Sequence, residues 1–433
     1  MTEANAKNRW WVVLGAVLVQ LSLGALYSWS VFTTPLVQAG WTKTETQIVF
    51  SVGLVSFALV MLAAGKKLAI WGPRKLSILS GLVLGGGWVL AGLLGAYNFW
   101  ILCLCLGVIG GTGIGLGYVV PIAVGMRWFP DKKGMITGLS VAGFGFGAMG
   151  WVKLAGTWGH LLELIGLSGT FITYGLMFTA LICLGSKWMV FPPEGWTPAG
   201  PPIKISKRPL WQRFKETISR KSAEPPKTEG YTGAAILKTR QYYLIITTFI
   251  ATAGTGTMTI GLMKLYPTLA LTNAGMDPVE AAATAGTAMA VFLSLGNGIG
   301  RIAWGAVSDK LGRRLSLLIL SSTLGFITIA FPAMAASMYL LFLGSFLIGF
   351  NYGGVFALFP AITADIFGTK NVGNNYPYVF LAYGIGGVFG PVLGGYLGDM
   401  GNFPLAFTIC GICCIIGAAT IAATKPPKGS NEA

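Results

Sequence analysis

Long apolar stretches separated by polar turns dominate the chain from residue 10 onward. A helix needs about 20 mainly apolar residues to cross a bilayer. Twelve stretches reach this length: residues 10–33, 45–66, 75–97, 99–126, 135–155, 167–191, 241–265, 281–307, 315–335, 337–367, 375–399 and 402–424. Their apolar residues form continuous runs and lack the alternation that is typical of half-buried strands. We therefore predict an all-α membrane protein with twelve transmembrane helices.

One longer polar segment divides these helices into two sets of six. Residues 192–240 are rich in proline and lysine, which argues against a packed core there. We predict an N-terminal six-helix half (1–191), a cytoplasmic linker loop (192–240), a C-terminal six-helix half (241–424) and a cytoplasmic tail (425–433). Within the linker, Pro209–Ser219 fits either a short helix on the membrane surface or a solvated connection.

The composition agrees with a membrane location. The chain has 433 residues, of which 54% are hydrophobic and 10% charged, whereas a soluble chain carries about 25% charged residues. A net charge of +16 would indicate nucleic-acid binding in a soluble protein. Here the cations lie between the spans, where membrane topology and anionic headgroups account for them. We therefore expect a lipid bilayer as partner and no nucleic acid.

The sequence offers no constellation for metal binding or catalysis. The single histidine, His160, follows the fifth span, and one histidine cannot make a metal site. The glycine string Gly110–Gly117 lies inside an apolar run, where it favours close helix packing over phosphate binding. All six cysteines lie in apolar runs, and we interpret them as small buried or lipid-facing residues. We expect no cofactor, no metal and no enzymatic activity.

Lysine and arginine mark every second loop. If the N-terminus lies inside, nearly all cations fall in cytoplasmic segments, except Lys43, Lys153, Lys264 and Arg301. The positive-inside rule then places both termini in the cytoplasm, and we expect the plasma (inner) membrane. Lys43 lies in an outer loop, and the long stems of Lys153 and Lys264 can reach the headgroups from nearby helix ends.

Arg301 lies deeper, inside the apolar part of Val291–Arg314. A guanidinium cannot lose its proton to escape a low dielectric, so a cation at this depth needs an anion or carbonyl partner. Asn297 lies four residues earlier, on the same helical face. No Asp or Glu precedes Asp309 in this run. We therefore predict that the missing counter-ion is the substrate, a small carboxylate.

A turn motif occurs twice, about 240 residues apart. Gly65–Lys75 follows the second span and Gly305–Arg314 follows the eighth. The second copy, through Gly305, Asp309, Gly312, Arg313 and Arg314, resembles the gating loop motif of the major facilitator superfamily. The first copy departs from it, since the Asp is missing and Pro73 separates Gly72 from Arg74. The resemblance implies two pseudo-symmetric six-helix halves with the substrate between them near the midplane, and we expect a monomer.

Further motifs resemble one branch of that superfamily, the oxalate/formate antiporters and monocarboxylate porters, and within it the bacterial L-lactate/pyruvate carriers. They are RWFPDKKG at Arg127–Gly134, Asn351–Gly354, Asn375-Tyr376 and the pair Asn297 and Arg301. The resemblance implies a secondary transporter of small monocarboxylates that works by alternating access and proton symport. Arg301 would bind the carboxylate.

This sequence departs from the branch at three positions. The oxalate carrier has a second cation, a lysine, in span eleven, where this chain has Tyr383; one cation suits a monocarboxylate. Mammalian carriers have an Asp four residues before the span-eight Arg, where this chain has Asn297, which cannot titrate. They also have a lysine in span one, and Trp10–Phe32 contains none.

The remaining candidates for the substrate pocket are polar tips in apolar spans, with one apolar neighbour. They are Tyr27, Tyr118, Asn351, Tyr352 and Tyr383, with Leu26 as wall for a methyl group. Tyrosine combines an apolar ring with a donor hydroxyl, which suits a small amphiphilic anion. The alternatives for each are an interhelical hydrogen bond or an aromatic side chain at the membrane interface.

The coupling mode stays open at this point. Asp365, Asp277 and Glu280 lie near the predicted helix ends, so we expect no titratable acid in the membrane core. A proton would then travel on the substrate's own carboxyl group beside Arg301. The alternative to symport is anion exchange of the oxalate/formate type. A channel would need a polar stripe along many helices, and a receptor would explain neither the repeated turn nor Arg301.

Overall fold

The computed structural model describes residues 9–129, 133–156, 158–193, 231, 233–368 and 372–424. Within these ranges the chain is helical and contains no strand. Most of the predicted linker loop, including Pro209–Ser219, and all of the predicted tail lie outside the described residues.

Six helical spans occupy the first part of the chain. The first span consists of α1 (Trp10–Leu23), the short 3-10 helix η2 (Gly24–Ser28) and α2 (Ser30–Gln38). It is followed by α3 (Lys43–Trp71), α4 (Pro73–Leu94), a fourth span of α5 (Phe99–Leu102), η3 (Cys103–Gly110) and α6 (Gly111–Trp128), then α7 (Lys133–Ala155) and α8 (Leu161–Ser186).

Six more spans follow, preceded by the short helix η4 (Gly233–Lys238). They are α10 (Arg240–Leu262), with the short α11 (Leu265–Asn273) after it; α12 (Pro278–Thr287), η5 (Ala288–Leu293) and α13 (Ser294–Leu311) in one span; α14 (Arg313–Met334); α15 (Met338–Phe367); α16 (Val372–Asp399); and α17 (Phe403–Ala422). The prediction of twelve membrane helices is confirmed. The first span was predicted to end at 33 but continues to 38, across the 3-10 turn.

In both repeated turns, a glycine with a positive φ angle ends the helix. Gly72 ends α3 with φ of +77°, and Gly312 ends α13 with φ of +89°. Residues with a side chain rarely adopt this left-handed region, so glycine stops each helix and lets the next one begin at once. Pro73 then starts α4, where its missing N–H costs no helical hydrogen bond.

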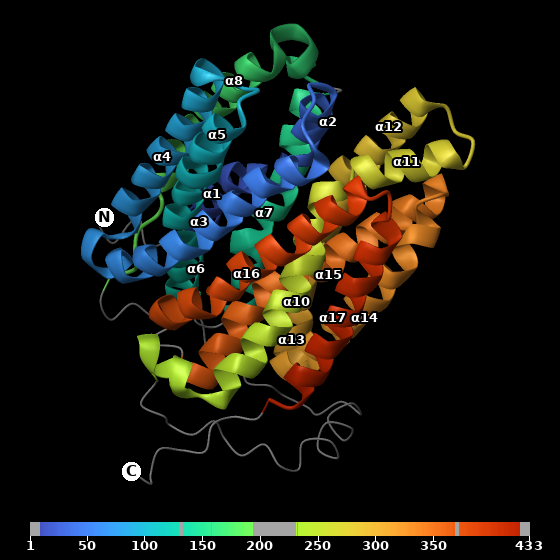
Figure 1. Ribbon diagram of the computed structural model, residues 1–433. Coiled ribbons are helices and arrows are strands. Elements are labelled where there is room, and N and C mark those ends of the chain that lie inside the picture. The colour runs from blue at the N-terminus through green and yellow to red at the C-terminus, as the bar shows by residue number, and fades with distance from the viewer. Residues whose placement is uncertain are drawn as a thin grey trace.

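The helices form two groups that lie side by side. Figure 1 shows α1–α8, in blue and green, next to α10–α17, in yellow to red. Helices α3 and α16 touch along their length, because Gly65 lies against Gly373 near one end and Gly395 lies against Thr44 near the other. Helix α7 packs on α13 through Gly138 and Gly145. We call these two contacts between the groups the α3–α16 seam and the α7–α13 seam.

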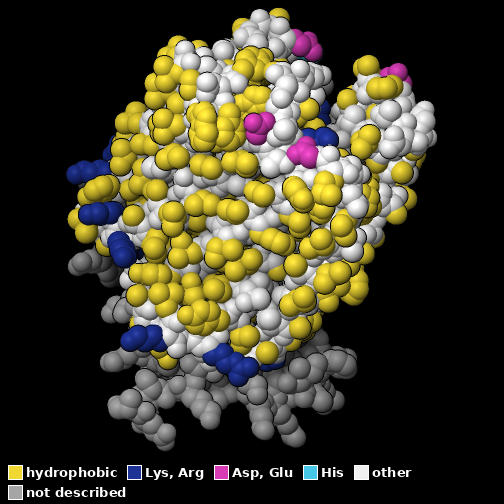
Figure 2. All heavy atoms as spheres, viewed as in Figure 1, with side chains coloured by type: hydrophobic (Ala, Val, Ile, Leu, Met, Phe, Trp, Pro, Cys, Tyr) yellow, Lys and Arg dark blue, Asp and Glu magenta, His cyan; other side chains and the backbone are white. Residues whose placement is uncertain are grey.

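The outer surface fits a bilayer. Figure 2 shows hydrophobic side chains over most of the visible face, with Lys and Arg mainly along its left and lower edges. Consecutive spans run in opposite directions, so the start of the first and the end of the twelfth lie at the same end of the bundle. We call that end the termini side and the opposite end the far side.

Candidate functional site

Arg301 lies at the α7–α13 seam and is completely buried, with 0% of its surface exposed. Its Nε donates to Oδ1 of Asn297 at 2.9 Å, one turn earlier on α13. Its Nη1 donates to the backbone carbonyl of Val141 on α7 at 3.1 Å. Its Nη2 has no hydrogen-bond partner. The cation therefore bridges the two helix groups and keeps one donor nitrogen unused.

Aromatic rings cover this guanidinium. Its Cζ lies 4.4 Å from the ring centroid of Phe356 on α15 and 5.2 Å from that of Phe144 on α7. Ring faces attract cations most strongly where water is excluded. Among the described residues, no carboxylate forms an ion pair with Arg301. Since a buried cation without an anion is costly, an incoming carboxylate would be strongly stabilised here.

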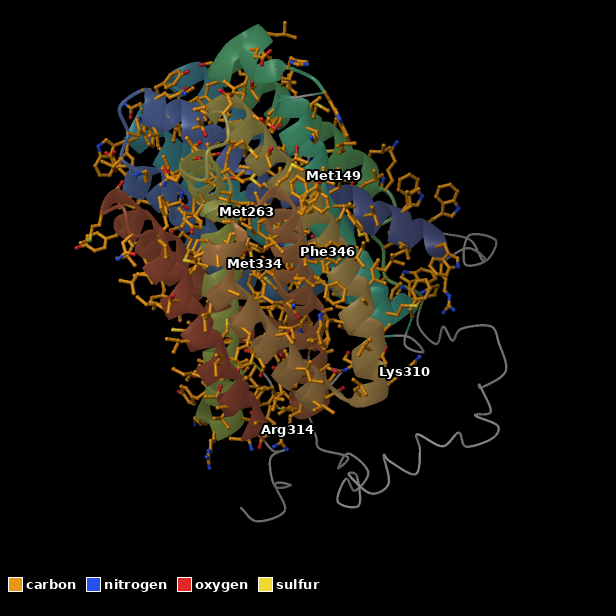
Figure 3. The ribbon with its side chains drawn as sticks, turned by 90° about the vertical axis from the view of Figure 1, so that its right-hand side faces the viewer. Met149, Met263, Lys310, Arg314, Met334 and Phe346 are labelled. Carbon is orange, nitrogen blue, oxygen red and sulfur yellow. The ribbon has the colours of Figure 1, made fainter. Side chains whose placement is uncertain are left out.

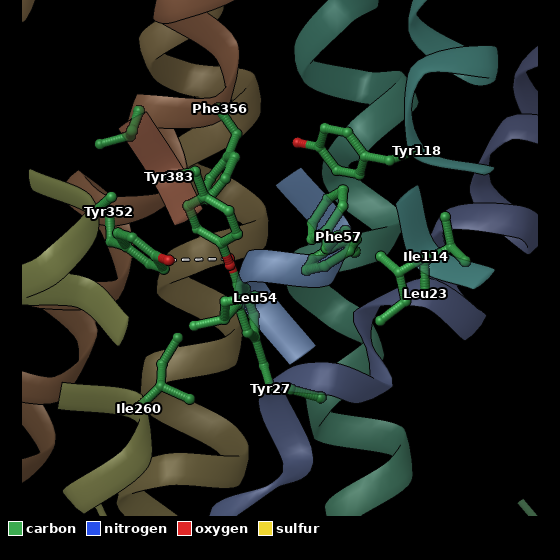
Figure 4. Close-up of a cluster of buried hydrophobic side chains, with 14 of the residues drawn as sticks. Leu23, Tyr27, Leu54, Phe57, Ile114, Tyr118, Ile260, Tyr352, Phe356 and Tyr383 are labelled. Carbon is green, nitrogen blue, oxygen red and sulfur yellow. Dashed lines mark hydrogen bonds between the residues drawn. The ribbon is translucent and has the colours of Figure 1, made fainter. Parts of the chain in front are cut away.

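The hydroxyl groups of three predicted tyrosines meet next to this cation. The hydroxyl of Tyr27 donates to that of Tyr352 at 3.1 Å and lies 3.3 Å from that of Tyr383. Figure 4 shows the three side chains converging from η2, α15 and α16. Tyr27 also interacts electrostatically with Arg301. These neutral hydroxyls satisfy one another and link the two helix groups.

Two further predicted residues keep polar atoms free. The hydroxyl of Tyr118 and Nδ2 of Asn297 are buried and have no hydrogen-bond partner. Tyr118 interacts electrostatically with Arg301, and its ring packs edge-on against Phe144 at 5.4 Å. A buried polar group left unpaired costs about 1–3 kcal/mol. With Nη2 of Arg301, the predicted site residues therefore present three unpaired polar groups, all of which can donate to an anion.

Asn351 and Leu26 lie apart from this constellation. Oδ1 of Asn351 accepts from the hydroxyl of Thr323 on α14 at 2.9 Å, and its Nδ2 donates to the carbonyl of Leu347 at 2.9 Å. Its amide is thus used within the α10–α17 group. Leu26 lines an apolar cavity inside the α1–α8 group, with Trp29 and Phe50 among its other walls.

Several residues of the site were not among the predicted pocket residues. The carbonyl of Val141 carries no sequence signal, because every residue has one. Phe144 and Phe356 could not be distinguished in the sequence from the many aromatic residues that are expected to face lipid. Tyr376 is 1% exposed and has an unpaired hydroxyl, and its ring packs against Phe380, which also contacts Tyr118. Its spacing of seven residues from Tyr383 places both on one helical face and could have indicated it.

Close backbone contact holds the site together. A Cβ atom added to Gly145 would lie 2.5 Å from Oδ1 of Asn297, and one added to Gly138 would lie 2.3 Å from the carbonyl oxygen of Arg301. Both distances are too short for real atoms. Glycine at these two positions lets α7 approach Asn297 and Arg301 of α13 closely.

Gly145→Ala is therefore expected to lower substrate uptake about tenfold, an effect of about 1.4 kcal/mol, because the new methyl group must push Asn297 away from Arg301. Gly150→Ala, on the same helix, is the matched control, since a Cβ there meets nothing within 4 Å. Uptake of labelled substrate into proteoliposomes measures both. Equal rates for the two variants would contradict the importance of this contact.

The repeated turn after α13 forms a network on the termini side. Arg313 hydrogen-bonds to the carboxylate of Asp309 and the hydroxyl of Ser308, and its Nε lies 3.5 Å from a carboxylate oxygen of Asp365 on α15. It also donates to the carbonyl of Gly305 at 3.4 Å. Arg314 bonds to the carbonyl of Ala422 on α17. Figure 3 shows Arg314 and Lys310 at the lower end of the bundle.

The first copy of the turn is built differently, as its sequence indicates. It has no Asp, and in the part of it that the structure describes no ion pair takes the place of Asp309 and Arg313. Nζ of Lys66 lies 5.9 Å from the ring centroid of Tyr378 on α16. A Cβ on Gly65 would lie 2.8 Å from the carbonyl of Gly373. This end of the α3–α16 seam therefore depends on close packing.

Comparison with known proteins agrees with this architecture. The family model described as Major Facilitator Superfamily matches residues 12–294 and 281–433. An uncharacterized MFS-type transporter, YhjX of Escherichia coli, is 29% identical over 90% of this chain and 88% of its own length. The oxalate:formate antiporter of Oxalobacter formigenes is 26% identical, over 98% and 93%. Apicoplast pyruvate carrier 1 of Toxoplasma gondii is 24% identical, over 88% and 82%.

These matches cover nearly the whole chain. They agree with its twelve spans and with the resemblance of its turn motifs to those of the superfamily. The three relatives named above all carry transporter or carrier names. The chain therefore belongs to the major facilitator superfamily and is a multi-pass membrane transporter.

Proposed function

We propose that this protein is a secondary active transporter of small monocarboxylates, such as L-lactate or pyruvate, and that Arg301 binds the carboxylate. The observation that carries the proposal is a fully buried guanidinium with an unused Nη2 and no carboxylate partner among the described residues. Similarity to an oxalate:formate antiporter and a pyruvate carrier supports small carboxylates as the class.

One carboxylate suits this site better than two. The position at which the oxalate carrier has a second cation holds Tyr383, whose hydroxyl lies 3.3 Å from that of Tyr27. A second carboxylate would lose its hydration against neutral hydroxyls, a cost that no cation there would offset. The unpaired groups of Tyr118 and Asn297 are free to bind a hydroxyl or keto oxygen of the same substrate.

In the transport cycle that we propose, the substrate carboxylate bonds to Nη2 of Arg301 and takes the place of the Val141 carbonyl at Nη1. Charge-assisted bonds of this kind are stronger than the bond to a neutral carbonyl. The two helix groups then rock about the site and expose it to the other side of the membrane. Asp309, Arg313 and Asp365 tie α13, α14 and α15 together on the termini side, which we assign to the cytoplasm of a monomer in the plasma (inner) membrane.

We propose proton symport as the coupling mode. In the described spans every Asp and Glu lies near a helix end, from Glu45 in the first turn of α3 to Asp399 at the end of α16. We propose that the proton crosses on the carboxyl group of the substrate itself, beside Arg301. The alternative is anion exchange, as named for the Oxalobacter relative.

Two uptake assays in proteoliposomes test these modes with labelled L-lactate. The first imposes an inward proton gradient without internal anion, and the second supplies internal anion without a gradient. Symport predicts uptake in the first assay, and obligatory exchange predicts uptake only in the second. If neither assay gave uptake of L-lactate, pyruvate or acetate by folded protein, the monocarboxylate proposal would be wrong.

A further inference from the structure

A carboxylate on the far side joins the two helix groups. Asp399, the last residue of α16, accepts hydrogen bonds from the backbone N–H groups of Lys43 at 3.2 Å and Thr44 at 3.1 Å. These two residues begin α3, and the hydroxyl of Thr44 bonds to the same carboxylate. Nζ of Lys43 in turn donates to the carbonyl of Gly398 at 3.1 Å.

This contact caps one helix from another. The first N–H groups of a helix have no partner within it, and a negative charge there is favoured by the helix dipole. A cap normally comes from the residue just before the helix, and α3 has one, because Thr42 and Glu45 form a capping box. Asp399 supplies further acceptors from 355 residues away, across the α3–α16 seam.

The same stretch of α3 makes two more polar contacts with α10–α17. Nε2 of Gln47 donates to the carbonyl of Gly261 on α10 at 3.3 Å. The hydroxyl of Ser51 donates to the carbonyl of Gly387 on α16 at 2.8 Å. Asp399 is the charged end of this row, and it lies at the opposite end of the bundle from Asp309 and Arg313. Figure 1 shows the start of α3 meeting the end of α16 below α2 and α12.

We propose that Asp399 is a latch that holds the far side closed by capping α3, and that its bonds break whenever the transporter opens on that side. The proposal rests on the alternating access of the proposed function, but not on the identity of the substrate. Asp399 is exposed, so water replaces its partners when the groups separate. The latch is thus strong enough to bias the closed state and weak enough to release.

The charged side chains near the latch already have other partners. Among the described residues, the charged side chains in the first turn of α3, which Asp399 caps, are Lys43 and Glu45. Nζ of Lys43 is occupied by the Gly398 carbonyl and lies 5.6 Å from the ring centroid of Phe403 on α17. The carboxylate of Glu45 is bonded to Thr42. The backbone N–H groups of α3 are therefore the main partners of Asp399.

The test measures how often the far side opens. Met289 of η5 is a suitable reporter position, since it is 1% exposed and contacts Ser30 of α2 between the two helix groups. In the full chain with its six native cysteines replaced, Met289→Cys is labelled with a membrane-impermeant thiol reagent from the far side. Adding Asp399→Ala is expected to raise the labelling rate about tenfold, which corresponds to about 1.4 kcal/mol.

Two other carboxylates on the same side provide matched controls. Asp277 caps its own helix α12 through the N–H groups of Val279 and Glu280, at 2.9 and 3.2 Å. Glu45 supports the start of α3 without contacting α16. In the part of the chain that the structure describes, neither side chain bonds across the α3–α16 seam. Asp277→Ala and Glu45→Ala are therefore expected to leave the labelling rate within about twofold of that of the unmodified protein, which corresponds to less than about 0.4 kcal/mol.

Equal acceleration by all three variants, or none by Asp399→Ala, would overturn the latch. If Asp399→Ala fails to fold, Asp399→Asn replaces it, because this variant keeps an oxygen acceptor without the charge. It is expected to raise the labelling rate by a smaller factor. No increase in the labelling rate would overturn the proposal. Labelling needs no substrate. A labelling shift without L-lactate uptake in unmodified protein would therefore leave the latch intact and reject the substrate assignment.

Discussion

Arg301→Ala is expected to abolish uptake of small monocarboxylates. The guanidinium is fully buried, and its Nη2 is the strongest unpaired donor among the described site residues. A hydrogen bond to a charged group contributes about 1.5–3 kcal/mol, so losing two of them lowers binding by about 3 kcal/mol or more. That corresponds to a loss of affinity of roughly a hundredfold or greater.

The measurement is initial uptake of labelled L-lactate into proteoliposomes over a range of concentrations. Arg301→Lys keeps the charge but lacks the planar fork that reaches Asn297 and Val141 at once. It is expected to fall between the unmodified protein and Arg301→Ala. Lys310→Ala, which removes an exposed cation from the same helix, should retain uptake. Transport by Arg301→Ala at the unmodified rate would refute the site.

Asn297→Asp is expected to suppress uptake at pH 7 by about a hundredfold, an effect of about 2.8 kcal/mol. Oδ1 of Asn297 already accepts from Nε of Arg301 at 2.9 Å. A carboxylate at this position would neutralise the cation from within α13 and repel the substrate. Coulomb interactions over about 4 Å are large in a buried site, so the substrate would meet a paired charge in place of a free one.

Asn297→Leu separates this charge effect from the loss of the amide. It removes the bond to Arg301 and the unpaired Nδ2 but adds no negative charge. We expect it to weaken uptake by about tenfold or somewhat more, because a hydrogen bond to a charged group contributes about 1.5–3 kcal/mol. If both variants weakened uptake equally, charge neutralisation would not be the reason, and the cation would have another role.

The fold was largely predictable because bilayer thickness sets a minimum length for an apolar helix. Runs such as 99–126 and 337–367 are too long for strands, and the spans at 99–128 and 338–367 match them closely. The first span was harder to delimit. The prediction ended it at residue 33, but Ser30 and Thr33 are fully buried and α2 continues to Gln38.

The candidate site was only partly predictable. Arg301 stood out because it is a cation within an apolar run. Asn297 and Asn351 look alike in sequence, since each is an amide in an apolar span. The structure separates them, because Asn351 is satisfied by Thr323 and Leu347, whereas Asn297 bonds to Arg301. Contacts such as that of Asp399 with Lys43 depend on which helix ends meet, and local sequence does not encode this.

The buried cation of Arg301 also has an electrical consequence. Because the guanidinium keeps its proton, each reorientation of the empty site transfers one positive charge from one side of the membrane to the other. One elementary charge moved across 100 mV is worth about 2.3 kcal/mol. A negative interior would therefore hold the empty carrier with its site open inward. The return of the empty carrier would therefore depend on the membrane potential.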